Sequence, residues 1–146
     1  MFMKILIVSD SHGDNSKLDR LLEKHKDMDY YLHAGDSLSS KAELYPFLSV
    51  RGNCDYSIDL DDKLIIHTPY GKLLMKHVKN LTSFDLSQND IKIFVFGHTH
   101  VREFGKVNDI YYINPGSISL PRDGRGLSYA IIEINKDDVK IQFLNI

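Results

Sequence analysis

Features that mark secreted, membrane-spanning and nucleic-acid-binding proteins are scarce in this chain. Its 146 residues include one cysteine, Cys54, so no disulfide bond can form within the chain, as is usual in a reducing compartment. The apolar stretch over residues 1–8 gives way to Ser9 and Asp10 and is far too short for a secretory signal or a membrane span. The net charge of -2 and the scattered basic residues argue against a general affinity for the nucleic-acid backbone. We therefore expect a cytoplasmic protein with neither a membrane nor nucleic acid in general as its partner.

What is present is typical of one compact domain. With 42% hydrophobic and 26% charged residues, the chain can bury an ordinary core. The sequence contains neither a repeat nor a linker rich in proline, glycine and serine. We therefore expect a single domain over residues 1–146, and the sequence leaves open whether the chain forms a homo-oligomer.

In the first half of the chain, short β-rich runs alternate with helical spacing. The run KILIV at Lys4–Val8 is continuously apolar, which is typical of a strand covered on both faces. Leu18, Leu21 and Leu22 follow the spacing of the buried stripe of a helix. The pattern predicts strands over Lys4–Val8 and Asp29–His33 and helices over Asn15–His25 and Ser40–Phe47, after which Leu48–Val50 leads into Arg51-Gly52-Asn53.

The second half is richer in strands. The turn Thr68-Pro69-Tyr70-Gly71 joins two β-rich runs, which predicts a hairpin. One helix is expected over Ser83–Gln88, and strands are expected over Lys63–His67, Lys72–His77, Ile91–Phe96, Val101–Lys106, Ile110–Ile113, Leu127–Ile134 and Val139–Leu144. An α/β half followed by a β-rich half indicates an α/β (α+β) fold of two packed sheets flanked by helices.

Polar residues that can bind metal ions follow the carboxyl ends of the apolar runs. Residues i and i+2 of an extended segment point the same way, so we expect Asp10 and His12 of Asp10-Ser11-His12 to bind one ion. Imidazole mixed with carboxylate suits manganese, iron, nickel or zinc better than calcium. The full set of candidate metal ligands is Asp10, His12, Asp36, Asn53, His77, His98 and His100.

The order of these motifs resembles a known family. The strings IVSDSHG, HAGD, RGNCD, FGHTH and NPGS are similar to those of the calcineurin-like metallophosphoesterases. Within them, the chain resembles the small bacterial and archaeal phosphodiesterase branch, which also includes the retromer subunit homologue. The resemblance covers Lys4 to the strands after Arg122. It implies a four-layer αββα sandwich of two mixed sheets, with a two-metal site at one end that hydrolyses a small phosphate ester, most simply a diester.

The resemblance also implies a role for each ligand. It assigns Asp10, His12 and His100 to one metal ion, Asn53, His77 and His98 to a second, and Asp36 to both. A bridging carboxylate is expected because two divalent cations about 3.5–4 Å apart repel each other strongly. The implied mechanism uses a hydroxide shared by the two ions, and the amide N–H of Asn53 as a catalytic donor to a phosphoryl oxygen. Manganese is the expected metal, with nickel, iron, zinc or magnesium as alternatives.

Two segments depart from the family pattern. The usual T-H-G-H segment is replaced by Lys76-His77-Val78-Lys79, so Lys79 either offers a positive charge to the substrate or is solvated. Many larger relatives carry a histidine after the asparagine, where this chain has Cys54-Asp55. Asp55 is therefore a candidate catalytic acid, and the alternative is that it only shapes the turn.

Other polar residues leave alternatives open. Arg122 is a candidate for binding the substrate phosphate, or it pairs with Asp123 beside it. We expect His25 to be an exposed helical residue, and His33 and His67 to be strand residues bonded to their neighbours. In a different functional class, the chain could be an inactive binding scaffold with the same fold. The enzyme is favoured because all seven ligand positions keep residues able to bind a metal.

Overall fold

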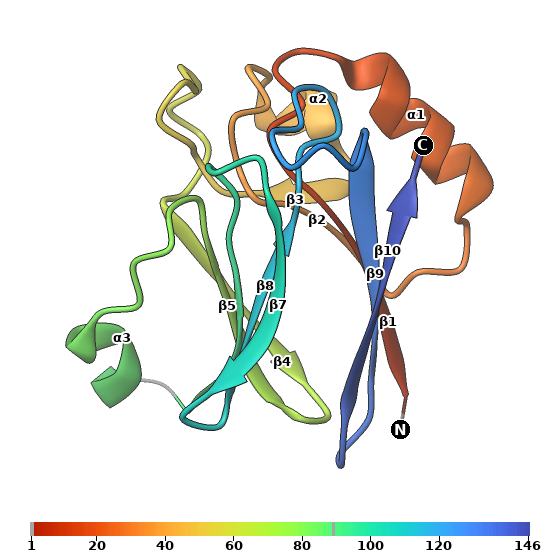
Figure 1. Cartoon of the computed structure of the whole chain (residues 1–146). Coiled ribbons are helices and arrows are strands. Elements are labelled where there is room, and N and C mark those ends of the chain that lie inside the picture. Colours follow the sequence, from red (N-terminus) through yellow and green to blue (C-terminus); the bar gives the residue numbers. More distant parts are fainter. Residues whose placement is uncertain (1, 89) are drawn as a thin grey trace.

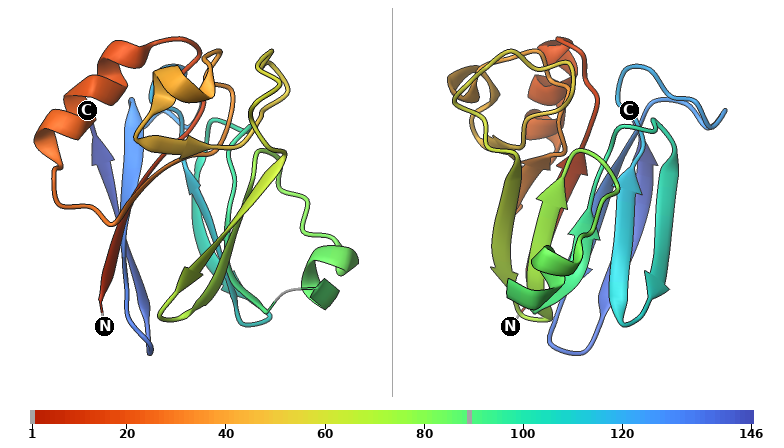
Figure 2. Two further views of the ribbon diagram at one scale, coloured as in Figure 1. Left: turned by 180° about the vertical axis from the view of Figure 1, so that it is seen from behind. Right: turned by 90° about the vertical axis from the view of Figure 1, so that its left-hand side faces the viewer.

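Two five-stranded sheets pack face to face in the computed structural model of the chain, which describes residues 2–88 and 90–146 (Figures 1 and 2). The strand orders are β10-β9-β1-β2-β3 in the first sheet and β4-β5-β6-β8-β7 in the second. The first sheet contains β1 (Met3–Val8), β2 (Tyr30–His33), β3 (Phe47–Ser49), β9 (Ser128–Ile134) and β10 (Val139–Asn145). The second contains β4 (Lys63–Thr68), β5 (Gly71–Lys76), β6 (Ile91–Val95), β7 (Arg102–Val107) and β8 (Ile110–Pro115). Both sheets mix parallel and antiparallel pairs, so the predicted sandwich is confirmed.

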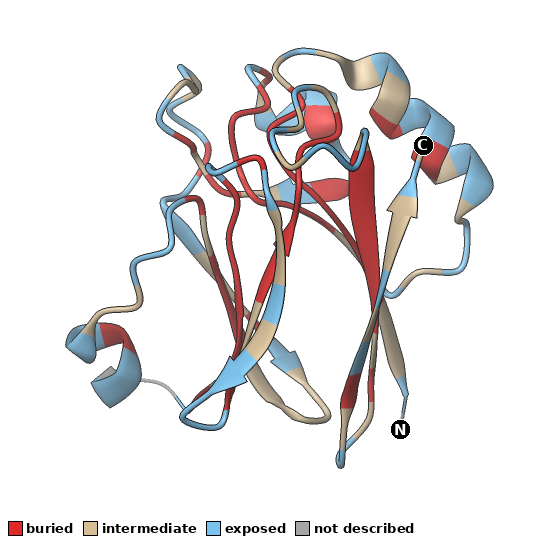
Figure 3. Ribbon diagram, viewed as in Figure 1, coloured by how far each residue is buried: buried red, intermediate tan, exposed pale blue. Residues whose placement is uncertain are grey.

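Strand β1 explains why its sequence is apolar at every position. Ile5 and Ile7 face the core between the sheets, where they pack with residues of β5 and β6 such as Met75. Leu6 and Val8 face the other way and pack with Leu18 of α1 (Asn15–Lys24). Because both faces are covered, the side chains of Ile5 to Val8 are fully buried (Figure 3).

On the outer side of the second sheet, Leu81 of the loop before α3 (Ser83–Gln88) packs on the apolar residues of this face, and α3 projects beside it (Figure 2). The carboxylate of Asp85, which is 2% exposed, binds the Nζ of Lys76 at 2.5 Å and of Lys63 at 3.2 Å. Burial works to raise the pKa of Asp85, but hydrogen bonds from Lys76, Thr82 and Lys63 outweigh it and hold the pKa well below its ordinary value. Asp85 thus attaches α3 to the hairpin of β4 and β5.

The second predicted helix is shorter than expected. Helix α2 spans Lys41–Leu44, where Ser40 and Glu43 form a reciprocal capping box. Pro46 disfavours helical backbone at Tyr45, so the helix ends before it and Phe47 begins β3. The prediction of a helix over Ser40–Phe47 was therefore wrong in its second half.

Histidine 25 also departs from expectation. It follows α1 as its C-cap, with its backbone N–H bonded to Leu21. Its side chain is half-buried, with Nε2 2.8 Å from the hydroxyl oxygen of Tyr129.

No helix within residues 2–88 and 90–146 is long and apolar enough to cross a membrane.

Candidate metal centre

The loops that follow β1, β2, β3, β5 and β6 meet at one end of the sandwich. The backbone N–H groups of Asp10 and His12, in the loop after β1, bond to the carbonyls of Gly35 and Asp36, in the loop after β2. The backbone N–H of His98, after β6, donates to Asp10 Oδ2 at 3.1 Å. Loops of both sheets therefore hold the predicted ligands against one another.

Asp10, His12 and His100 form the first group of possible ligands. One ligand atom from each lies within 4.8 Å of the others, and His100 Nε2 is 3.3 Å from Asp10 Oδ1. Among the residues that the structure describes, Asp10 Oδ1 and His12 Nε2 are buried without a hydrogen-bond partner. Burying such atoms unpaired is costly, and a cation between them would satisfy both.

A second group adjoins the first. Asp10, Asp36 and His77 also offer ligand atoms within 4.8 Å of one another. His77 Nε2 lies 3.2 Å from Asp36 Oδ2 and 3.9 Å from Asp10 Oδ1. Asn53 Oδ1 lies 2.9 Å from His77 Nε2 and 3.2 Å from His98 Nδ1. Asp10 is thus the carboxylate common to both groups, whereas Asp36 stands beside His77.

Backbone carbonyls orient two of the imidazoles. His77 Nδ1 lies 2.7 Å from the carbonyl of Ala34, and His100 Nδ1 lies 2.6 Å from that of Leu120. Since a carbonyl only accepts, each Nδ1 carries the hydrogen and each Nε2 presents its lone pair to the carboxylates. This tautomer is the one in which histidine binds a metal through Nε2.

The two carboxylates are held in a similar way. Asp10 Oδ2 accepts hydrogen bonds from Ser9 Oγ at 2.6 Å and from the His98 N–H. Asp36 Oδ1 accepts one from the Cys54 N–H at 2.8 Å. In each residue one oxygen is fixed by donors and the other faces the imidazoles, as in a ligand oriented by its surroundings.

Strained backbone is concentrated at these residues. Five of the seven candidate ligands have a positive φ: Asp10 at 55°, His12 at 47°, Asp36 at 61°, His98 at 72° and His100 at 62°. The expectation that Asp10 and His12 converge because their segment is extended was therefore wrong, although their side chains do meet. Left-handed backbone at non-glycine residues costs about 1–3 kcal/mol each and is characteristic of functional sites.

Two glycines make room for the carboxylates. A Cβ at Gly97 would lie 2.0 Å from Ser9 Oγ and 2.8 Å from Asp10 Oδ2. A Cβ at Gly52 would lie 2.2 Å from Asp36 Oδ1. Any side chain at either position would push a candidate ligand out of place, which explains the glycines in FGHTH and RGNCD.

Asp55 lies in the turn after Asn53 and contacts the backbone of Asp36. Its Oδ2 accepts the N–H groups of Asp36 at 2.9 Å and Gly52 at 2.7 Å, and its Oδ1 accepts that of Leu38 at 2.8 Å. These three bonds join the loops that carry Asp36 and Asn53. They favour the structural alternative for Asp55 over that of a catalytic acid.

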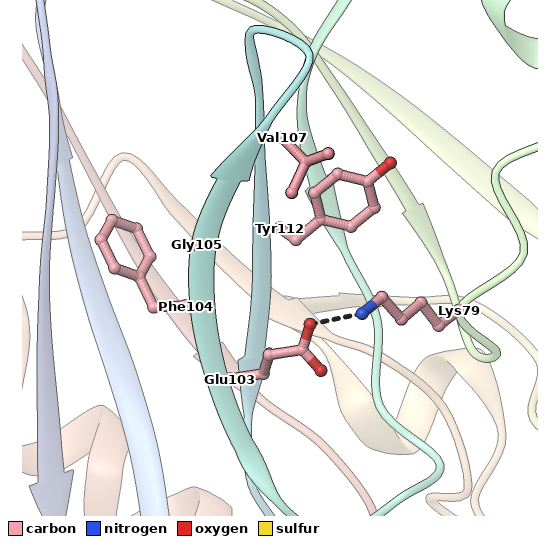
Figure 4. Close-up of a pocket in the computed structure, with 6 residues that line it drawn as sticks. All are labelled: Lys79, Glu103, Phe104, Gly105, Val107 and Tyr112. Carbon is pink, nitrogen blue, oxygen red and sulfur yellow. Dashed lines mark hydrogen bonds and ion pairs between the residues drawn. The ribbon is translucent and has the colours of Figure 1, made fainter.

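Lys79 points away from the centre. Its Nζ pairs with Glu103 Oε2 at 2.5 Å and lies over the rings of Phe96 and Tyr112, at the pocket drawn in Figure 4. The ion pair with Glu103 offsets the positive charge of Lys79. This argues against the first of its two predicted roles, in which the charge is offered to a substrate. The side chain is 47% exposed, which agrees with the second alternative, a solvated lysine.

Arg122 is exposed, and its backbone N–H donates to the carbonyl of His100 at 2.9 Å. Asp123 instead binds the backbone N–H and the Nε of Arg102, at 2.9 and 3.4 Å. The alternative in which Asp123 pairs with Arg122 is thus wrong. A phosphate-binding role for Arg122 stays a prediction.

Sequence reasoning missed the serines that support the centre. Ser117 and Ser119 donate to the carbonyl of Asp10 at 2.9 and 2.7 Å. The signal was the NPGS string, whose serine is Ser117. His33 donates from Nε2 to Ser11 Oγ at 2.8 Å, since its Nδ1 accepts the Gly35 N–H.

The environment of His33 agrees with the prediction that its neighbours satisfy it. Burial is the main cause that lowers the pKa of His33 to about 4. The ring is therefore neutral at physiological pH. His67 is exposed on β4.

Comparison with known proteins agrees with this geometry. The model of the calcineurin-like phosphoesterase superfamily domain matches residues 3–137. The chain is 33% identical over 152 residues to the probable metallophosphoesterase YsnB of Bacillus subtilis, covering 97% of this chain and 90% of YsnB. It is 27% identical over 168 residues to the phosphodiesterase YfcE of Escherichia coli, covering 90% and 88% of the two chains.

A solved structure of similar sequence has the same fold. It is that of a conserved uncharacterized protein of Streptococcus pneumoniae, described as a predicted phosphoesterase. It is 28% identical, with a TM-score of 0.89 over 99% of this chain and 90% of that one. The matched model spans most of the chain and includes all seven candidate ligands. The chain belongs to the calcineurin-like phosphoesterase superfamily, a family of metal-dependent hydrolases.

Proposed function

We propose that this chain is a dinuclear metal-dependent phosphodiesterase that acts in the cytoplasm on a small phosphate ester. The observation that carries the proposal is the position of Asp10 Oδ1, a buried oxygen 3.3 Å from His100 Nε2 and 3.9 Å from His77 Nε2. This oxygen stands between two groups of ligand atoms. Each of the two groups can hold one cation, so the arrangement fits two cations.

The residues divide the work of holding two cations. Asp10, His12 and His100 would hold one, and Asn53, His77 and His98 would hold the other. Asp10 belongs to both groups of ligand atoms and Asp36 to the second, and we propose that Asp36 is shared between the cations as well. When bound, the cations would lower the pKa of a water molecule that attacks phosphorus and offset charge on the phosphoryl oxygens. Manganese is the metal that we propose, because mixed imidazole and carboxylate ligands suit it.

Asn53 is placed to contact the ester directly. Its Oδ1 faces His77 and His98, and its Nδ2 lies 3.5 Å from Cys54 Sγ, which is a weak acceptor. The side chain is exposed. Its N–H groups can therefore donate to a phosphoryl oxygen as charge builds there.

Asp55 was the candidate to protonate the leaving group, and its hydrogen bonds argue against this role. Both oxygens of Asp55 already accept backbone N–H bonds, so neither is placed to donate a proton. We infer that the leaving group departs unassisted or takes a proton from water. The enzyme should then prefer esters of acidic alcohols or phenols.

The test is hydrolysis of bis-p-nitrophenyl phosphate with Mn²⁺, compared with the monoester p-nitrophenyl phosphate. We expect the diester to be cleaved faster, activity to vanish on chelation, and Mn²⁺ to restore it. Two bound ions per chain without turnover of either ester would instead indicate the inactive scaffold. One bound ion per chain, counted by elemental analysis, would overturn the dinuclear centre.

A further inference from the structure

A small groove is formed by residues of the loops that carry Asp36 and Asn53 of the candidate metal centre. It has a volume of about 250 Å³, below the roughly 300–1,000 Å³ of pockets that hold a whole drug-sized ligand. It can therefore take one substituent of a substrate. It is lined by Leu38, Ser39, Ser40, Tyr56 and Ser57.

The apolar surface of the groove comes from two exposed side chains. Tyr56 is 88% exposed and Leu38 is 41% exposed. The lining hydroxyls are already bonded: Ser39 Oγ to the carbonyl of Ser37 at 3.2 Å, and Ser40 Oγ to the Glu43 N–H at 3.2 Å. A ring entering the groove would thus have the side chains of Tyr56 and Leu38 as its apolar contacts.

The groove is fixed to the metal-ligand loops. Leu38 lies two residues after Asp36, and Tyr56 lies three residues after Asn53. Asp55 joins the two loops through its bonds to the N–H groups of Asp36, Leu38 and Gly52. A substituent in the groove would therefore belong to an ester whose phosphorus lies at the centre.

The backbone of Leu38 is strained. Its φ is 57°, in a region that leucine rarely adopts and that asparagine tolerates better. The conformation is held by the bond from its N–H to Asp55 Oδ1 at 2.8 Å. Strain of this kind is characteristic of ligand-binding segments, and here it leaves an apolar side chain at the wall of the groove.

The charge of the groove selects against an anionic substituent. All five lining residues are uncharged, and Ser57 Oγ donates to the carboxylate of Asp59. A second phosphate in the groove would meet this negative charge without a cation from the lining. A neutral ring has no such cost, and stacking on an aromatic side chain stabilises it.

We propose that the groove of Leu38 and Tyr56 binds the second ester group of a phosphodiester, and that this group is uncharged and carries an aromatic or heterocyclic ring. The proposal rests on the proposed function, since it places phosphorus at the metal centre. It also names the substrate class as diesters, because a monoester has no second group to place there. Leu38 and Tyr56 are then specificity-determining residues.

Binding to the Mn²⁺-loaded protein, measured by calorimetry, tests the groove without relying on turnover. The two probes are diphenyl phosphate and dimethyl phosphate, which carry the same charge. We expect the diphenyl ester to bind about tenfold more tightly, as expected when one ring stacks on an aromatic side chain. Tyr56→Ala and Leu38→Asn should bring this ratio close to one, and Tyr56→Phe should preserve it.

Ile58 supplies a matched control. It lies on the same loop, is 92% exposed and does not line the groove, so Ile58→Ala should leave the ratio unchanged. Leu38→Asn is chosen because asparagine accepts a positive φ, which keeps the fold intact. A wild-type ratio near one, or a ratio unaffected by Tyr56→Ala, would overturn the proposal.

Hydrolysis assays distinguish a failure of this proposal from a failure of the proposed function. The substrates are phenyl p-nitrophenyl phosphate and methyl p-nitrophenyl phosphate, which share a leaving group. If the binding ratio behaves as expected and neither ester is cleaved, the groove stands and the phosphodiesterase activity fails. If both are cleaved and Tyr56→Ala lowers their kcat/KM equally, the activity stands and the groove fails.

Discussion

Asp36→Asn removes one negative charge from the metal centre with little change in shape. The Asp36 side chain is 4% exposed, with Oδ1 held by the Cys54 N–H at 2.8 Å and Oδ2 3.2 Å from His77 Nε2. Asparagine can keep the bond from Cys54 through its amide oxygen. The substitution therefore changes the charge between the cations and leaves the surrounding loops in place.

The size of the effect follows from the charges. Two divalent cations about 4 Å apart repel each other by about 17 kcal/mol at an effective dielectric constant of about 20. Against their four positive charges stand the two carboxylates of Asp10 and Asp36, so the substitution raises the net charge from two to three. If Asp36 lies between both ions, its loss should prevent the pair from binding together.

Thermal unfolding and elemental analysis measure this loss. An ion present at 100 times its dissociation constant adds about 2.7 kcal/mol of stability, and each kcal/mol raises Tm by about 2–4 °C for a chain near this size. Two ions should therefore raise the wild-type Tm by roughly 10–20 °C. In Asp36→Asn we expect this rise to fall by about half or more, with no more than one ion retained per chain and no turnover.

Asp62→Asn is the control, because Asp62 is 80% exposed and pairs with Arg51 away from the ligands. It should keep both ions and the full rise in Tm. Two ions per chain and normal turnover in Asp36→Asn would refute the reasoning. Two retained ions without turnover would refute bridging by Asp36 and would point instead to Asp10, the carboxylate common to both groups.

Three further predictions concern other parts of the molecule. Asp85→Asn should lower the free energy of unfolding by about 2 kcal/mol, because the buried carboxylate loses its charge-assisted hydrogen bonds to Lys76, which is 18% exposed, and Lys63, which is 41% exposed. The folded pKa of Asp85 lies below its unfolded value near 4. The difference in stability between wild type and variant should therefore be complete at pH 7 and shrink as the pH falls below about 4. Urea unfolding of both proteins at pH 7 and at a pH below about 4 would check this. Gly97→Ala should displace Asp10 and lower the number of ions per chain, whereas Gly105→Ala, where a Cβ meets nothing within 4 Å, should not. His100→Ala should raise the metal concentration needed for half-maximal activity, and an unchanged requirement would remove His100 from the ligands.

The fold was largely predictable where strands are buried on both faces. A run such as Ile5 to Val8 has no polar face, and the sequence shows this directly. Helix α2 was misjudged because its apolar residues continue into β3, and the local backbone preference before Pro46 decided where the helix ends. Boundaries of this kind depend on single residues and not on periodicity.

The candidate site was predictable in its membership and not in its geometry. Four of the five motifs named six of the candidate ligands, His77 came from its place at the end of a predicted strand, and the structure brings all seven to one end of the sandwich. No pattern in the sequence indicated the positive φ of Asp10 and His12, because the strain is imposed by contacts between distant loops. The sharing of Asp10 between two groups, and the groove beside Leu38, have the same origin.

The strained backbone and the buried carboxylate charge at this centre both destabilise the metal-free protein. Five candidate ligands hold left-handed backbone, and Asp10 Oδ1 is buried without a donor in the part of the chain that the structure describes. Both features cost free energy in the metal-free protein, and the carboxylate cost would be offset only by a cation. The glycines, serines and carbonyls around the ligands hold these side chains in place before the metal arrives, so binding would require little rearrangement. The metal-free chain should then be native in fold but lower in Tm, and a metal-free form that is unfolded would show that this preorganisation is absent.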